Sequence, residues 1–213
     1  MEDISARALR HLREVDVVLC EDTRVTKKIL SHYEIPTPTL SYHEHSSIKK
    51  IDDIIRLLEE GKNLALVSDA GTPGISDPGT FLIDSIRKKV PEVSIVSIPG
   101  PSAVVAALSI AGVHAADFTF LGFLPHKKGR ETLFREIAGS PRAVVFYESP
   151  HRILKTFESL ATHLEESRLV FVGRELTKMF EEGVRGSARE VQAYYEKHPD
   201  KVRGEFVVVV GPG

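Results

Sequence analysis

The sequence of 213 residues predicts an α/β protein with a parallel sheet in its first half and a mixed sheet in its second half. In the first half, short apolar runs alternate with helix-like stretches at the spacing of β–α–β units, which is typical of parallel sheets. After Gly112 the apolar runs are separated by one helix or by a turn, which suits mixed strand directions. We therefore expect an N-terminal domain over residues 1–113 and a C-terminal domain over residues 114–213, with the boundary near residues 112–117.

The N-terminal domain is expected to contain five helices and four strands. Apolar residues spaced three and four apart, such as Ile4, Ala8 and Leu12, indicate the first helix. Thr23 is expected to cap the second helix, and Ser46 or Ser47 the third. In order, the expected elements are a helix over 4–14, a strand over 15–20, a helix from 23 that ends before Pro36, a strand over 39–42, a helix over 48–60 stopped by Gly61, a strand over 64–67, a helix over about 80–89, a strand over 93–98 and a helix over 102–111.

The C-terminal domain is expected to contain short strands and two helices around one basic loop. In order, the expected elements are a strand over 118–121, a basic loop over 125–130, a helix over 131–138, a strand over 143–147, a helix over about 151–164, a strand over 169–172, a further candidate strand over 180–185 and a strand over 205–210.

Composition narrows the class of protein. The net charge is −2, with 13 Lys and Arg against 16 Asp and Glu up to residue 113 and 15 against 14 beyond it, so neither half is a generic polyanion binder. Contact with a nucleic acid therefore requires a local patch, and Lys127-Lys128-Gly129-Arg130 is the one concentrated basic loop. No apolar run approaches the roughly 18 residues that span a bilayer. Cys20, the single cysteine, excludes an internal disulfide, and we expect a cytoplasmic protein.

The most informative segment runs from Ser68 to Gly79, directly after an apolar strand. Three glycines and two prolines in this loop fix an unusual backbone path at the carboxyl end of a strand, where open α/β sheets bind ligands. A similar break, Pro99-Gly100-Pro101-Ser102, follows the next expected strand. Because Pro73 removes an N–H group, the loop suits an uncharged or zwitterionic ligand better than a phosphate. The alternative is that both breaks are structural turns.

Charged clusters follow several other expected strands. Glu21-Asp22-Thr23-Arg24 lies at the same sheet edge as the loop, although acids at a helix N-terminus are also favoured by the helix dipole. The segments 147–152 and 173–178 each carry an arginine suited to phosphate or carboxylate, with surface salt bridges as the alternative. His43 and His45 lack a nearby third ligand, so we expect no metal site. The P-loop, the dinucleotide fingerprint and Gly-x-Ser-x-Gly are absent.

Six ordered segments together resemble one family over nearly the whole chain. They are Glu21–Arg24, Ser68–Gly79, Pro99–Ala103, Gly122–Pro125, Phe146–Arg152 and Gly173–Lys178. They resemble the tetrapyrrole methylase superfamily, in the branch that methylates small-subunit ribosomal RNA. Members usually carry a strand ahead of the segment matching residues 2–5, so we expect this first strand to be missing from the N-terminal domain.

The resemblance implies the two-domain tetrapyrrole-methylase-like fold and a homodimer that binds S-adenosylmethionine in a cleft between its domains. It implies methyl transfer to the ribose 2′-hydroxyl of a cytidine in 16S ribosomal RNA of the small ribosomal subunit, with no membrane partner. Two alternatives remain open. One is methylation of carbon atoms of a tetrapyrrole, and the other is a cofactor-binding ribosome-assembly factor without catalysis.

Residue positions in the matching segments imply cofactor contacts. Gly71-Thr72-Pro73 resembles the superfamily's Gly-Asp-Pro loop, with a threonine in place of the acidic residue. Thr72 and Ile75 are expected near the methionine part of the cofactor. The full set of expected cofactor contacts is Ser68, Asp69, Ala70, Gly71, Thr72, Gly74, Ile75, Ser76 and Asp77 in the loop, Ser102 and Ala103 in the second turn, and Phe146, Tyr147 and Leu176 on the adenine side.

Catalytic and RNA-binding residues are expected among the charged clusters. A ribose hydroxyl is a weak nucleophile, so a base or hydrogen-bond acceptor should assist it, and Glu21 and Asp22 are the candidates. The residues expected to hold phosphate or orient the base are Arg24, Arg174 and Lys178. Those expected to contact the RNA are Lys127, Lys128, Arg130 and Arg152.

Overall fold

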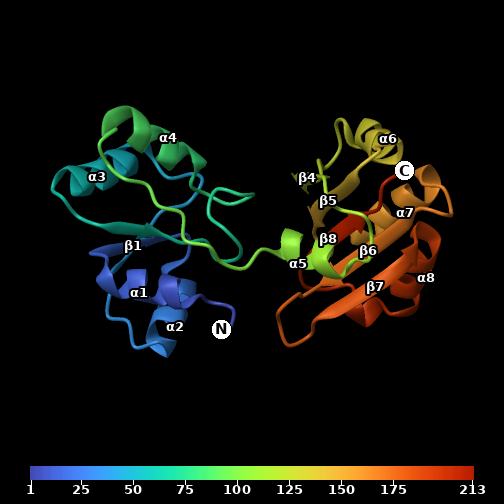
Figure 1. The fold of residues 1–213 in the computed structure, drawn as a ribbon, viewed down its shortest axis with the longest axis horizontal. Helices are drawn as coiled ribbons and strands as arrows, with labels where there is room; N and C mark the ends of the chain where they lie inside the picture. The colour runs from blue at the N-terminus through green and yellow to red at the C-terminus, as the bar shows by residue number, and fades with distance from the viewer. The chain divides into compact units, whose positions relative to one another are not determined.

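The computed structural model describes residues 1–213, which form two compact units, Met1–Ser102 and Ala103–Gly213 (Figure 1). The division falls earlier in the chain than the boundary expected near residues 112–117. The reason lies in helix α5 (Ala103–Ile110), because Val104 and Ala107 of this helix are buried against strands of the second unit. An apolar helix belongs to the unit whose core it covers. The spacing of its apolar residues predicts the helix but does not show which of the two cores it covers.

The first unit contains a parallel sheet with the strand order β2-β1-β3. The strands are β1 (Val17–Cys20), β2 (Thr39–Ser41) and β3 (Leu64–Leu66). The helices are α1 (Ala6–Glu14), α2 (Thr23–His32), α3 (Ile48–Glu59) and α4 (Thr80–Lys89). Helices α1 and α2 cover one face of the sheet, and α3 and α4 cover the other (Figure 1). Successive side chains of β1 point to opposite faces, so Val18 packs against α1 and α2 while Leu19 packs against α3 and α4. The expected parallel sheet is thus confirmed.

Side-chain caps fix the starts of these helices. Ser47, one of the two serines considered, caps α3 through the Lys50 N–H. The expected cap of α2 was wrong: Asp22 accepts a 2.8 Å hydrogen bond from the Arg24 N–H, and Thr23 is already the first helical residue. Both aspartate and threonine cap helices, and aspartate is the better of the two, as observed for Asp22.

The expected strand over residues 93–98 is also wrong. This segment forms no regular secondary structure and pairs with no strand, and Ile95 and Val96 are exposed. The β-branched residues suggested a strand, but strand propensity reflects packing against neighbours more than a backbone preference. The sheet ends at β3 on one side and at β2 on the other, and no ladder reaches this segment.

The second unit contains a mixed five-stranded sheet with the order β4-β5-β8-β6-β7. The strands are β4 (Phe118–Phe123), β5 (Ala143–Glu148), β6 (Leu169–Arg174), β7 (Glu182–Ser187) and β8 (Phe206–Val210). Only β4 and β5 are parallel, and the other neighbours are antiparallel. This confirms the expected mixed sheet, and β7 corresponds to the candidate strand placed over residues 180–185.

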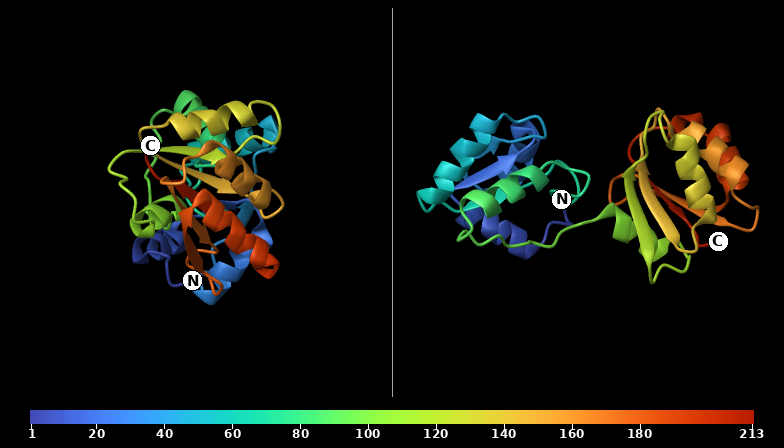
Figure 2. Two further views of the ribbon diagram at one scale, coloured as in Figure 1. Left: turned by 90° about the vertical axis from the view of Figure 1, so that its right-hand side faces the viewer. Right: turned by 90° about the horizontal axis from the view of Figure 1, so that it is seen from above.

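Helices cover both faces of this second sheet (Figure 2). One face lies under α6 (Arg130–Gly139), α7 (Ile153–His163) and α8 (Ala188–Lys197), the last of which is followed by the short helix η1 (Pro199–Lys201). The other face lies under α5. The central strand β8 is fully buried, since it has neighbours on both edges and helices on both faces. None of the helices in either unit has the length and apolar character needed to cross a membrane.

Candidate functional site

The loop after β3 has a closed and tightly constrained backbone. Within it, the Gly74 N–H donates to the Pro78 carbonyl at 3.2 Å, and the Ile75 N–H donates to the Thr72 carbonyl at 3.1 Å. Gly79 has a φ of 142°, and a Cβ there would lie 2.9 Å from Leu66 Cδ2 and 3.3 Å from the Gly74 nitrogen. Only glycine fits this position, so the path of the loop is fixed by its sequence.

This loop borders a pocket of about 380 Å³ in the first unit. A pocket of that size lies within the usual range for small-molecule sites. Of the expected cofactor contacts, Gly74, Ser76 and Asp77 line it. The other lining residues were not expected, and they are Tyr42, Glu44, Pro78, Gly79, Thr80 and Phe81. Tyr42 and Glu44 follow β2 in the chain, and the order of the strands, which the sequence does not give, is what brings them to this edge.

Glu21 connects the acidic cluster to the loop. Its carboxylate accepts a 3.3 Å hydrogen bond from the Asp69 N–H, across the ends of the neighbouring strands β1 and β3. The Ser68 hydroxyl donates to the Ala70 carbonyl at 3.0 Å. The exposed residues of the loop are Asp69, Ala70, Gly71, Thr72, Ile75 and Ser76. Glu21 and the loop, expected at the same edge of the sheet, are in contact in the structure.

Asp22 and Arg24 form a local pair at the start of α2. Arg24 donates to the Asp22 carboxylate through Nε and Nη2, the latter at 2.7 Å, and the Arg24 backbone N–H donates to it as well. These hydrogen bonds lower the pKa of Asp22 to about 2. A carboxylate with so low a pKa is a weak proton acceptor near neutral pH. Asp22 therefore caps α2 and holds the exposed side chain of Arg24.

The second turn lies where the two units meet in sequence. The Ser5 hydroxyl donates to the Pro99 carbonyl at 3.2 Å, which ties the N-terminal end of α1 to the turn within the first unit. Ser102 is the last residue of the first unit and is half-buried. Ala103 begins α5 in the second unit.

The three residues expected on the adenine side occupy different environments in the second unit. Phe146 is fully buried in the core under α6, α7 and α8, so its side chain has no free surface for a ligand. Tyr147 points to the opposite face, where its ring lies 5.1 Å from that of Phe120 and 5.4 Å from that of Phe123. Leu176 packs on the same side as Tyr147 and is half-buried.

Arg174 and Lys178 are engaged with carboxylates of their own unit. Arg174 Nε lies 3.3 Å from Glu182, and its side chain is only 8% exposed. Lys178 Nζ donates to Glu175 at 3.1 Å and to Glu205 at 2.8 Å. Burial lowers the pKa of Lys178, but the hydrogen bonds to the two glutamates outweigh it and the net pKa is raised. Both cations are therefore held in place before any ligand arrives.

The carboxylates in these pairs predict a loss of stability in acid. Burial raises the pKa of Glu182, but its hydrogen bonds to Lys201, Tyr194 and Arg174 outweigh this, and the net pKa falls below the ordinary value of 4.5. The unfolded state then binds more protons than the folded state below that pH, so the stabilisation is complete above pH 4.5 and is lost as the pH falls. We expect the thermal midpoint of wild type to drop below pH 4.5 more steeply than that of Glu182→Gln.

Calorimetric scans at several pH values test this expectation. Glu158→Gln, at an exposed position of α7, is the control and should follow wild type. Parallel curves for wild type and Glu182→Gln would contradict the assignment of acid lability to Glu182.

The four residues expected to contact RNA fall into two groups. Lys127 and Lys128 are exposed, as expected for residues that contact RNA. Arg130 and Arg152 instead hold the buried carboxylate of Glu148, at 3.3 and 2.6 Å. Glu148 was not among the residues expected to have a function. The signal was present, because Glu148 falls two residues after Phe146 on the buried face of a strand, where a carboxylate requires cationic partners.

Comparison with known proteins identifies the class. The sequence matches the family of tetrapyrrole (corrin/porphyrin) methylases over residues 1–192. A cobalt precorrin-4 methyltransferase shares the fold with a TM-score of 0.71 at 17% identity, covering 99% of this chain and 89% of that chain. A uroporphyrin-III C-methyltransferase from Thermus thermophilus, solved with S-adenosylhomocysteine, has a TM-score of 0.64 at 17% identity, with coverage of 99% and 91%. The chain belongs to the tetrapyrrole methylase family, and the expected fold class is confirmed.

Relatives of higher identity carry one name, ribosomal RNA small subunit methyltransferase I. The relative from Thermotoga maritima is 44% identical over 210 residues, covering 99% of this chain and 92% of the relative. The relative from Escherichia coli O157:H7 is 40% identical over 211 residues, covering 99% and 73%. The resemblance drawn from the six segments is confirmed, and the chain is a methyltransferase.

Proposed function

We propose that this methyltransferase transfers a methyl group to the ribose 2′-hydroxyl of a cytidine in 16S ribosomal RNA, on the small ribosomal subunit. The observation that carries the proposal is the similarity, over 99% of the chain, to relatives named for ribosomal RNA. The neighbours that act on tetrapyrroles are under 25% identical and support the fold alone. This weighs against methylation of tetrapyrrole carbon atoms.

The loop after β3 fits S-adenosylmethionine, the cofactor that a methyltransferase of this family implies. The loop presents hydroxyl, carboxylate and carbonyl groups, and Pro73 and Pro78 each lack an N–H group, which favours a zwitterion over a phosphate. The residues proposed to hold the cofactor are Ser68 to Thr72 and Gly74 to Asp77 in the first unit, with Ser102, Ala103, Tyr147 and Leu176 as further contacts. When bound, the cofactor supplies an activated methyl group on a sulfonium.

Glu21 is the residue proposed to receive the proton of the substrate hydroxyl. Its carboxylate already lies beside the loop through Asp69, whereas Asp22 is held by Arg24. Displacement at the methyl carbon requires an aligned oxygen that loses its proton as the new bond forms. We propose that Asp22 orients Arg24 and caps α2, and that Arg24, Arg174 and Lys178 lie near the RNA phosphates or orient the base.

The proposal is tested with labelled S-adenosylmethionine and two possible acceptors, small ribosomal subunits and a tetrapyrrole precursor. Small ribosomal subunits that lack the modification should be labelled at a single cytidine ribose, and a tetrapyrrole precursor should not. Labelling of the tetrapyrrole alone would overturn the proposal. Calorimetric binding of the cofactor with no transfer to any acceptor would favour the non-catalytic assembly factor.

Lys127 and Lys128 are proposed to contact RNA phosphates. Each neutralised phosphate releases counterions, so Lys127→Ala with Lys128→Ala should reduce the slope of log affinity against log salt by about 2. Titration of a small-subunit RNA fragment at several salt concentrations measures the slope. Lys155→Ala, which removes an exposed lysine of α7, is the matched control and should leave the slope unchanged. An unchanged slope in the double variant would remove the loop from the RNA interface.

We further propose that the protein acts as a homodimer in the cytoplasm, where its ribosomal substrate is found. Exposed apolar residues on α5 and β4 of the second unit, including Val105, Ile110 and Phe118, support an interface between copies. Sedimentation equilibrium at micromolar concentration tests the dimer.

A further inference from the structure

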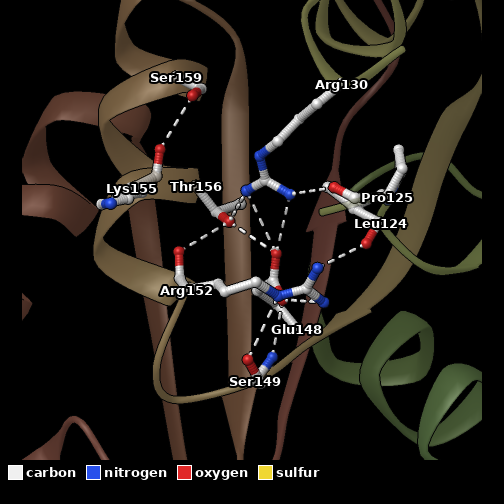
Figure 3. A network of polar contacts seen from close by, with 9 residues as sticks. All are labelled: Leu124, Pro125, Arg130, Glu148, Ser149, Arg152, Lys155, Thr156 and Ser159. Atoms are coloured by element: carbon white, nitrogen blue, oxygen red, sulfur yellow. Dashed lines mark hydrogen bonds and ion pairs between the residues drawn. The ribbon is translucent and has the colours of Figure 1, made fainter. Parts of the chain in front are cut away.

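A carboxylate at the end of β5 is completely enclosed and holds two arginines (Figure 3). The Glu148 side chain is fully buried, and the side chains of Arg130 and Arg152 are each 16% exposed. Glu148 Oε1 accepts from the Ser149 N–H at 2.8 Å and lies 2.6 Å from Arg152 Nη2. Oε2 accepts from the Thr156 hydroxyl at 2.9 Å and from Arg130 Nη2 at 3.3 Å. Both oxygens are thus satisfied inside the protein.

The two arginines also hold the loop before α6 by hydrogen bonds to its backbone. Arg152 Nη1 donates to the Leu124 carbonyl at 2.7 Å, and Arg130 Nη1 donates to the Pro125 carbonyl at 3.1 Å. Arg130 is itself the first residue of α6. The loop is therefore fixed at its start through the carbonyls of Leu124 and Pro125 and at its end through the side chain of Arg130 (Figure 3). Between these anchors, Lys127 and Lys128 are exposed.

The carboxylate of Glu148 balances positive charge around the loop. Four cations, Arg130, Arg152, Lys127 and Lys128, lie on or beside the loop, and Glu148 is the carboxylate that pairs with the two arginines. Without it, two half-buried guanidinium groups would face each other unpaired, which is strongly unfavourable. The loop would then relax away from its anchors, and the spacing of the two lysines would no longer be fixed.

From this geometry we propose that Glu148 is a positioning residue for RNA binding: it fixes the loop 124–130 so that Lys127 and Lys128 are presented to the phosphate backbone in one arrangement. The proposal rests on the proposed function, since it assumes that these lysines contact RNA. It assigns Arg130 and Arg152 to the support of the loop. Prior ordering of a contact residue raises affinity because less conformational freedom is lost on binding.

The experiment combines Glu148→Gln with the double lysine variant and measures RNA affinity over a range of salt concentrations. Glu148→Gln alone should lower the salt slope by about 1, although it leaves both lysines in place. Added to the double lysine variant, it should cause no further loss of RNA affinity, because the lysines it positions are already absent. S-adenosylmethionine affinity, measured by calorimetry, should stay within about twofold of wild type, since the loop after β3 is untouched.

Arg168→Lys is the matched control. Arg168 is also buried and ties the Ala138, Ser140 and Gly211 carbonyls, but it does not contact the loop. It should lower the thermal midpoint and leave the salt slope unchanged. Where Glu148→Gln fails to fold, Thr156→Val takes its place, because it removes the hydroxyl shared by Glu148 and Arg130 without changing charge or volume much.

Three results would overturn the proposal. One such result is a normal salt slope in folded Glu148→Gln or Thr156→Val, together with weaker RNA binding by the double lysine variant. It would show that the lysines bind RNA without being positioned by Glu148. Fully additive losses in the combined variant would show that Glu148 acts through other contacts. A double lysine variant that binds RNA as wild type does would show that the loop is not an RNA contact, and it would overturn the role of Glu148 as well. Transfer of the methyl group to the subunit would still support the proposed function.

Discussion

Replacement of Glu21 by glutamine is expected to lower the rate of methyl transfer to small subunits by about 100-fold or more. Glutamine keeps the size of the side chain and can still accept a hydrogen bond from the Asp69 N–H, so the loop should hold its position. What is lost is the basic oxygen that receives the hydroxyl proton. Single-turnover rates under saturating cofactor and subunit measure this step, and both dissociation constants should stay near those of wild type.

The neighbouring acid provides the control for this first prediction. Asp22→Asn keeps the capping of α2, because asparagine caps helices as well as aspartate does, and it removes the charge that holds Arg24. We expect the rate of Asp22→Asn to remain within about threefold of wild type, since a carboxylate with a pKa of about 2 is a poor base. The reverse ranking of the two variants would transfer the role of proton acceptor to Asp22.

Replacement of Gly79 by alanine is expected to weaken binding of S-adenosylmethionine by at least about tenfold. The new Cβ would meet Leu66 Cδ2 at 2.9 Å and the Gly74 nitrogen at 3.3 Å, and a φ of 142° is strained for any residue with a side chain. Strain of this kind is worth about 1–3 kcal/mol, enough to displace the turn at Gly74. Calorimetric titration of the cofactor measures the effect.

Gly61→Ala separates damage to the loop from general loss of stability. Gly61 also has a positive φ, of 78°, but nothing lies within 4 Å of the position where its Cβ would be. It ends α3, so the variant should lower the thermal midpoint and leave cofactor affinity unchanged. Equal cofactor affinities for Gly79→Ala and wild type would mean that the loop is not the binding element.

Much of the fold could be predicted because it follows local patterns. The helix over 80–89 was predicted with the bounds observed for α4, since its apolar spacing begins directly after Gly79 and ends before Pro91. The segment 93–98 has an equally clear apolar pattern, yet no strand formed there. A strand depends on a hydrogen-bonding partner that is often distant in sequence, so an apolar pattern is necessary for a strand but not sufficient.

The candidate site was predictable at the level of segments and less so at the level of side chains. Glu21 and the loop after β3 were placed at one rim because neighbouring parallel strands end at the same edge. For Phe146, Arg130 and Arg152 the sequence gives the residue type but not the direction of the side chain. Phe146 points into the core, and both arginines turn inward to a carboxylate that becomes their partner only once β5 is formed.

The position of β8 also constrains how the second unit can assemble during synthesis. Strands β5 and β6 do not pair with each other, and each has β8 as a neighbour, although β8 is the last of the eight strands to be translated. Until residues 206–210 leave the ribosome, the sheet is divided into a parallel pair and a hairpin with exposed apolar edges. The newly made chain therefore depends on a late insertion step, the kind of non-local pairing that slows folding and leaves edges open to aggregation or to chaperones.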